Sequence, residues 1–160
     1  IIVSDDFGCT WEDYQSNGYF QTGNVHHTHL ASSADGKTIF AAHEEGSIYK
    51  SSDGGVTFYP SLSNNCTWSS IEASNDGKKV IASRINANQQ ICQGGFHLST
   101  DGGLTWRAVL DDRTHQNGAV SVSGDGGTFY IALCWGHIYK SIDDGNTWTV
   151  ACSRGICNNR

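Results

Sequence analysis

Short apolar runs recur at regular intervals along the chain, each one beside a polar turn. Three of these runs follow an Asp-Gly pair, within residues 33–42, 74–83 and 123–132. An Asp-Gly pair between apolar runs predicts a tight hairpin, because glycine tolerates a positive φ. No long apolar stretch has helical spacing and the chain holds a single Pro. The pattern therefore predicts β-strands and excludes a helical repeat.

Four segments of the form Ser-x-Asp-x-Gly-x-Thr-Trp/Phe, here called the box turns, follow the same repeat. They span residues 4–11, 51–58, 99–106 and 141–148. Their first serines lie 47, 48 and 42 residues apart. A fixed period in this range is typical of propeller blades or solenoid units. Each unit is therefore predicted to contain an inner strand, an Asp-Gly turn, a second strand, a third strand, a box turn and an outer strand.

The repeat predicts an all-β fold, a small β-propeller of four-stranded antiparallel blades. We expect one domain over residues 1–160, with about four blades, the last one incomplete and shared between the termini. The expected parts are a half-blade over residues 1–22, blades over about 23–64, 65–112 and 113–152, and a C-terminal tail over 153–160. Leu30, Ile71 and Val120 occupy equivalent inner-strand positions and should face the core between blades.

The half-blade allows more than one way of completing the ring. The favoured arrangement is a closed small ring, in which the half-blade pairs with the C-terminal tail. Alternatively, another subunit covers the open edge, because an unpaired strand edge invites association, or the chain is a fragment of a larger propeller. A homo-oligomer is compatible with the closed ring as well.

Each box turn carries one aspartate, and these carboxylates are natural first candidates for catalysis. They are Asp6, Asp53, Asp101 and Asp143. Aspartate, serine and threonine side chains bond readily to nearby turn amides, and the glycine of the motif permits a tight turn. One reaction does not need the same carboxylate in four repeats. We therefore predict that these aspartates hold the turns together.

The box turns resemble those of the Asp-box (bacterial neuraminidase repeat) family, and the resemblance covers nearly the whole chain. It implies a β-propeller of the kind found in sialidases, xyloglucanase-like enzymes, sortilin-like proteins and lectins. Sialidases bind the substrate carboxylate with three arginines, and no Arg-Ile-Pro motif precedes the first box turn here. Xyloglucanase-like enzymes place paired carboxylates between two large propellers, which 160 residues cannot supply. The resemblance therefore implies a non-catalytic, lectin-like member.

The composition of the chain argues against some classes of partner and favours one cellular compartment. The net charge is −6 with no block of like charges, which argues against a nucleic-acid partner. No apolar run approaches the roughly 18 residues that a membrane span needs. The chain starts at Ile1, contains no Met and has six cysteines, and Asn65 begins a glycosylation sequon. These features favour a processed, secreted protein.

Six cysteines in an oxidising compartment predict disulfides, although six free thiols are the alternative. Position in the blades suggests the pairs Cys66–Cys92 and Cys134–Cys152. It leaves Cys9 and Cys157, one near each terminus, as a ring-closing pair. Fifteen connectivities are formally open. No Cys-x-x-Cys pair occurs, so neither a zinc ribbon nor a thioredoxin-type site is indicated.

The loops opposite the box turns should share one face of the propeller and are the predicted binding surface. Amides, imidazoles and tryptophans there suit a sugar, because aromatic faces stack on C–H surfaces and amides bond hydroxyls. The carbohydrate-binding candidates are His27, Glu44, Asn86, Trp68, His115, Asn117, Trp135 and His137. The alternatives are that Trp68 fills core, that Trp135 packs on a disulfide and that residues 86–90 form a solvated loop.

A metal or a catalytic site is less well supported on this face. Histidines within residues 26–29, together with His43, could ligate a metal, but no cysteine or carboxylate completes a convincing set. We expect no cofactor, no metal and no catalytic residue. The sequence thus predicts a secreted, non-catalytic lectin with a glycan or glycoconjugate partner and no membrane insertion. The alternatives are a structural or protein-interaction module of an oligomeric assembly and, with less support, a glycoside hydrolase.

Overall fold

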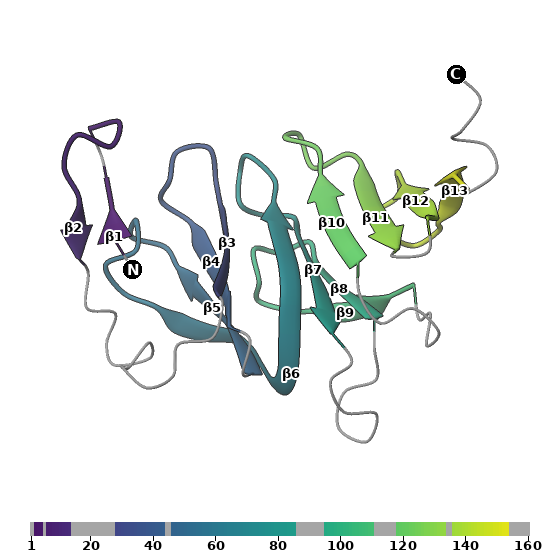
Figure 1. Ribbon diagram of the computed structural model, residues 1–160, viewed down its shortest axis with the longest axis horizontal. Helices are drawn as coiled ribbons and strands as arrows, with labels where there is room; N and C mark the ends of the chain where they lie inside the picture. The colour runs from purple at the N-terminus through teal and green to yellow at the C-terminus, as the bar shows by residue number, and fades with distance from the viewer. Residues whose placement is uncertain are drawn as a thin grey trace.

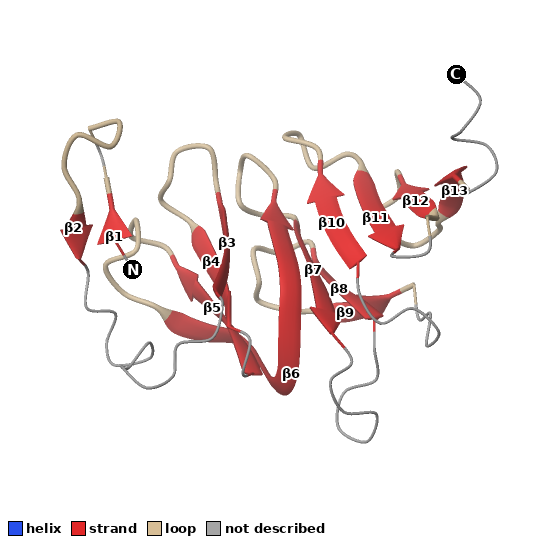
Figure 2. Cartoon of the chain, in the orientation of Figure 1, coloured by secondary structure: helices blue, strands red, loops and turns tan. Residues whose placement is uncertain are grey.

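The computed structural model describes residues 2–4, 6–13, 28–43, 46–85, 95–110, 118–133 and 136–153. These residues form β-strands joined by turns, without a helix (Figure 2). The strands are β1 Ile2–Val3, β2 Glu12–Asp13, β3 Thr28–Ser32, β4 Ile39–His43, β5 Gly46–Ser51, β6 Tyr59–Ala73, β7 Val80–Ile85, β8 Gly95–Ser99, β9 Arg107–Val109, β10 Gly118–Val122, β11 Phe129–Leu133, β12 Ile138–Ser141 and β13 Thr149–Cys152. All pairings among them are antiparallel.

The strands form three four-stranded units and one two-stranded unit. The first blade is β3, β4, β5 and residues 59–66 of β6, and the second blade is residues 67–73 of β6 with β7, β8 and β9. β6 serves both, so these two blades read as one seven-stranded sheet. The third blade is β10 to β13, and β1 with β2 form the half-blade.

The units stand side by side in a row (Figure 1), in the order in which they occur along the chain. This arrangement of repeated four-stranded antiparallel sheets confirms the predicted all-β, propeller-type fold. The half-blade lies at one end of the row and β13 at the other, so the described strands do not close a ring. Of the tail whose pairing was predicted to close it, only Ser153 is among the described residues.

Apolar side chains fill the two spaces between complete blades. Phe40 and Ile48 of the first blade meet Ile71 and Val80 of the second. Likewise, Ile81, Phe96 and Leu98 of the second blade meet Val120, Phe129 and Ile131 of the third. Neighbours along β7 therefore bury opposite faces, and both Val80 and Ile81 are 0% exposed. The second blade is sandwiched between the first and the third, which is why its second strand is apolar on both faces.

The inner strands show how much this sandwiching matters. Ile71 is 3% and Val120 6% exposed, as their predicted positions require. The expectation is wrong for Leu30, which is 53% exposed. Leu30 faces the half-blade, and the described half-blade consists only of β1 and β2, without inner strands that would cover it.

The box turns share one hydrogen-bond pattern. In the first blade, Ser51 Oγ donates to Asp53 at 2.7 Å and accepts from the Gly55 amide at 2.8 Å. Asp53 also accepts from the Thr57 amide and hydroxyl, at 2.9 and 2.5 Å. Asp6, Asp101 and Asp143 accept from the equivalent serine and threonine. These bonds favour the charged carboxylate and lower each pKa from 3.8 to about 2.

Candidate functional site

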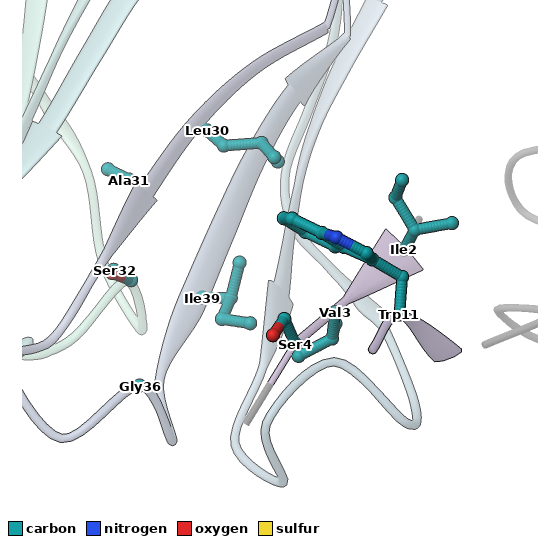
Figure 3. Close-up of a pocket in the computed structure, with 9 residues that line it drawn as sticks. All are labelled: Ile2, Val3, Ser4, Trp11, Leu30, Ala31, Ser32, Gly36 and Ile39. Atoms are coloured by element: carbon teal, nitrogen blue, oxygen red, sulfur yellow. The ribbon is translucent and has the colours of Figure 1, made fainter. Parts of the chain in front are cut away.

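A groove between the half-blade and the first blade is the candidate functional site. Its cavity volume is about 320 Å³. Ile2, Val3 and Trp11 line it from the half-blade, and Leu30 and Ile39 line it from β3 and β4. Figure 3 shows the indole of Trp11 reaching toward Leu30, with Val3 and Ile39 beneath. The hydroxyls of Ser4 and Ser32 are the polar side-chain groups in the lining.

The groove exists because the half-blade differs from the other units at one edge. In the box alignment, β1 takes the place of β5, the third strand of the first blade. β5 pairs with β4 on one edge and with β6 on the other. Within the described residues β1 pairs only with β2. No described strand occupies the place of a second strand beside β1, and the groove lies there.

Apolar side chains in the groove are much more exposed than their counterparts elsewhere. Trp11 is 59% exposed, whereas Phe58 at the same box position is 0% exposed. Leu30 differs in the same way from Ile71 and Val120. Covering apolar surface gains about 25 cal/mol per Å², and contiguous exposed apolar surface marks interaction sites. The groove is thus suited to an apolar or weakly polar ligand.

The predicted sugar-binding face is only partly within the described residues. His27, Glu44, Asn86, His115, Asn117 and Trp135 lie outside them, so their role stays a prediction. His137 is half-buried immediately before β12, and its ring centroid lies 6.4 Å from that of Tyr139. Neither His137 nor Trp68 lines the groove between the half-blade and the first blade.

Trp68 is a core residue and not a surface contact for a sugar, which corrects its assignment as a candidate. Its side chain is 1% exposed and belongs to the core between the first and second blades. The indole Nε1 donates to the Gly46 carbonyl at 3.3 Å. A buried ring whose N–H is satisfied in this way has no face left for stacking on a ligand.

His97 packs edge-on against the Trp68 ring and was not foreseen from the sequence. Their ring centroids lie 5.6 Å apart at an interplanar angle of 84°. Burial, with a smaller contribution from the charge of Arg84, lowers the pKa of His97 from 6.5 to about 4. The imidazole is therefore neutral at physiological pH. The repeat alignment could have indicated this position, because His97 aligns with Tyr49 and Tyr139 on the third strands.

The cysteines agree with the predicted pairs only in part. Cys66 and Cys152 are each disulfide-bonded. Cys92 and Cys134, their predicted partners, lie outside the described residues, so the pairing stays a prediction. Cys9 is an exposed free thiol, so the predicted Cys9–Cys157 bond is wrong for this structure. The box turn of Cys9 belongs to the half-blade, at the end of the row opposite β13 (Figure 1).

The described residues contain neither a candidate metal centre nor a membrane-spanning helix. In the described ranges, no three His, Cys, Asp or Glu side chains gather as a metal site would require. The same residues include no helix with the length and hydropathy needed to cross a membrane.

Comparison with solved structures places the fold among β-propeller proteins. The chain matches YCF48 bound to D1 peptide with 18% identity and a TM-score of 0.61, over 81% of this chain and 42% of that one. It matches the GH74 enzyme of Niastella koreensis with 22% identity and a TM-score of 0.58, over 77% and 21%. The match to a nidogen/laminin complex has 16% identity and a TM-score of 0.61, over 84% and 52%.

These similarities show the fold and do not extend to activity. The chain spans about half or less of the length of the three matched chains. No protein-family model matches the sequence, and no curated protein does. One propeller fold serves many unrelated functions, so function has to be argued from the groove and its residues.

Proposed function

We propose that this chain is a non-catalytic binding module that recognises a protein partner through the groove between the half-blade and the first blade. The observation that carries the proposal is the exposure of Trp11 and Leu30, because Phe58 at the Trp11 position and Ile71 and Val120 at the Leu30 position are buried. Trp106 and Trp148, the other counterparts of Trp11, are partly buried. A partner that covers both residues restores the environment that their counterparts have. Tryptophan in a partly open pocket is a frequent anchor of protein interfaces.

The chemistry of the groove favours a peptide over a charged or strongly polar ligand. Its lining holds apolar side chains and two serines, without a charged side chain. An extended peptide has apolar side chains to fill such a groove and backbone groups to pair with an open strand edge. YCF48 bound to D1 peptide and the nidogen/laminin complex have the same fold, which is compatible with a protein or peptide partner but does not identify one.

The electrostatics of the box turns support a non-catalytic role. A glycosidase needs two carboxyl groups with one pKa raised, so that it can act as an acid. All four box aspartates have a pKa lowered to about 2 by their own turn hydrogen bonds. Such carboxylates are poor proton donors near neutral pH. Their role in the turns explains their repetition.

A carbohydrate ligand is the second candidate, and Trp11 is the observation that favours it. An exposed indole can stack on the C–H face of a sugar, and Ser4 and Ser32 supply hydroxyls in the same groove. The loop face with its six undescribed candidate residues is the other place where a glycan could bind. Secretion, a glycan partner and a homo-oligomer remain predictions of the sequence.

Affinity selection separates the two candidates. The chain is screened against a displayed peptide library and, in parallel, against a glycan array, together with the variants Trp11→Ser and Leu104→Ser. Leu104 is a matched control, because it is 79% exposed in a box turn of the second blade, outside the groove. We expect enriched peptides whose affinity falls at least tenfold with Trp11→Ser and is unchanged with Leu104→Ser. Glycan binding that is lost in Trp11→Ser, without peptide enrichment, would replace the first candidate with the second.

A further inference from the structure

The complete blades show what normally covers the positions of Leu30 and Ile39. In the second and third blades, the inner hairpin, made of the inner and second strands, is covered by the inner hairpin of the preceding blade. Phe40 on the second strand of the first blade packs in one cluster with Ile71 and Val80. One blade further on, Ile81 packs with Val120 and Phe129. The same large apolar position on the second strand therefore covers the next inner hairpin in both interfaces.

The turns of these hairpins are also joined to one another. The Ala34 amide donates to the Asn75 carbonyl at 2.8 Å, and the Asn75 amide donates to the Gly124 carbonyl at 2.8 Å. The turns are in close contact, because a Cβ at Gly77 would lie 3.0 Å from the Thr38 side chain. A backbone ladder thus runs from turn to turn across the three blades.

This ladder stops at the groove. In the described part of the chain, no backbone amide donates to the Ala34 carbonyl, the acceptor equivalent to those of Asn75 and Gly124. A Cβ placed at Gly36 meets nothing within 4 Å, unlike one at the equivalent Gly77. The first blade therefore offers, beside Leu30 and Ile39, a free turn surface and an acceptor aligned with the existing ladder.

The half-blade offers the complementary strand edge. In the first blade, β4 pairs with β5 so that Phe40 lies opposite Lys50, with the lysine Nζ 5.9 Å from the ring centroid. Tyr130 and Lys140 repeat this pair in the third blade, with Nζ 6.0 Å from the ring centroid. In the box alignment Val3 takes the place of these lysines. A strand added to β1 would therefore meet an apolar neighbour at this position.

Building on the proposed function, we infer that the partner segment is a β-hairpin that completes the half-blade. Its second strand pairs with the open edge of β1, and a large apolar side chain opposite Val3 covers Leu30 and Ile39. Its turn lies against Gly36 and donates a backbone amide to the Ala34 carbonyl. The partner segment is thus a hairpin of the inner-blade type, recognised by strand addition and by one apolar anchor.

A hairpin taken from the chain itself is the probe for this inference. Residues 69–84 contain the inner hairpin of the second blade, carry Ile81 at the anchor position and contain no cysteine. Because an isolated two-stranded hairpin is marginally stable, the peptide is cyclised through a D-Pro-Gly link at its open end. Its controls are the cyclic peptide with Ile81→Ser and a linear peptide of residues 78–84.

Binding of the three peptides to the intact chain is measured by calorimetry, with Leu30→Ser and Leu104→Ser as protein variants. We expect the cyclic hairpin to bind at least tenfold more tightly than the linear strand. Ile81→Ser in the peptide and Leu30→Ser in the protein should each weaken binding at least tenfold, and Leu104→Ser should leave it unchanged.

Two results overturn the inference, and they bear differently on the proposed function. Equal affinity for the linear strand and the cyclic hairpin would overturn the inference that the partner segment is a hairpin. The proposed function would still stand if that binding were weakened by Leu30→Ser. The same holds if the hairpin does not bind but selected library peptides do so in a Trp11-dependent way. Absence of binding by the hairpin, the strand and every selected peptide would overturn both.

Discussion

Leu30 and Ile71 occupy the same position on equivalent inner strands, yet their side chains are 53% and 3% exposed. Ile71 is covered by Phe40 and its neighbours in the preceding blade. Leu30 faces the groove beside the half-blade, where no inner hairpin lies among the described residues. The pair therefore compares one structural position with and without its covering blade.

Because Ile71 is covered and Leu30 is exposed, alanine substitutions at the two positions should lower the stability of the fold by different amounts. Ile71→Ala should lower the free energy of unfolding by about 2–5 kcal/mol, because it leaves a cavity in a closed core. Leu30→Ala should cost about 0.5 kcal/mol or less, as for other exposed positions. Urea unfolding of both variants measures the two costs. Equal losses would show that Leu30 is covered in solution, contrary to the structure.

Alanine variants of two glycines distinguish the cost of backbone strain from the cost of disturbed packing between blades. Gly103 and Gly36 have φ values of +81° and +69°, so alanine at either should cost about 1–2 kcal/mol through the left-handed backbone alone. A Cβ at Gly103 would also lie 2.8 Å from Phe40 Cε1 and 2.6 Å from Ser61 Oγ, whereas one at Gly36 meets nothing within 4 Å. Gly103→Ala should therefore cost about 1–3 kcal/mol more than Gly36→Ala.

Thermal or urea unfolding of the two alanine variants tests this prediction. Ser61 has little freedom to move away, because its Oγ donates to the Gly103 carbonyl at 2.6 Å and accepts from Trp106 Nε1 at 3.0 Å. If both variants lose the same stability, the first and second blades do not pack in solution as they do in the structure.

The box turns predict a loss of stability in strong acid. The pKa of each box aspartate is lowered from 3.8 to about 2 in the folded chain, chiefly by bonds from the threonine at the end of the turn. A lowered folded pKa gives stability that is present above the unfolded pKa and is lost as pH falls through the folded one. Stability should therefore fall between about pH 4 and pH 2.

Asp101→Asn is the variant that tests the origin of this loss. Urea midpoints at pH 6, 4 and 2.5 should show a smaller drop below pH 4 in the variant than in the wild type, because one titrating group is gone. A drop of unchanged size would mean that the turn aspartates do not control acid stability.

The lowered pKa of His97 predicts a second range of pH, above that of the box aspartates, in which the stability of the fold changes. Its pKa is lowered to about 4 in the folded chain, first by burial and then by Arg84, against an ordinary value of 6.5. Protonation therefore favours the unfolded chain, and the stability from neutral His97 is lost as pH falls from about 6.5 to 4. An NMR titration should find this imidazole half-protonated near pH 4. His97→Phe should reduce the dependence of stability on pH in that window, and a titration midpoint near 6.5 would contradict the half-buried position of the imidazole.

Periodicity alone was enough to predict the strands, the box turns and the blades. Those features depend on residues close in sequence, such as the Ser51, Asp53 and Thr57 hydrogen bonds. Burial between blades depends instead on which unit stands next in the row. Leu30 carries the same local signal as Ile71, so its exposure could not be predicted without knowing what covers it.

The candidate site was harder to predict, for a reason that Trp68 illustrates. The alignment placed it with loop residues, but it lies within β6, the long strand shared by the first two blades. The pairing with β7 shifts register between Trp68 and Ser70, and such irregularities change the face on which a strand side chain lies. The groove itself involves Trp11 and Leu30, which are 19 positions apart in sequence and belong to a box turn and to an inner strand of different units.

Hydrogen–deuterium exchange of the intact chain, with and without a saturating peptide from the affinity selection, tests the central claim most directly. If the partner binds in the groove, slowed exchange should be confined to residues 2–13 and 28–43, which contain β1, β2, β3 and β4. Leu104→Ser should show the same protection, and Trp11→Ser should show clearly weaker protection at equal peptide concentration. Protection instead at residues 86–94, 111–117 or 134–135, which the sequence predicts to lie on the loop face, would contradict the assignment of the groove as the binding site.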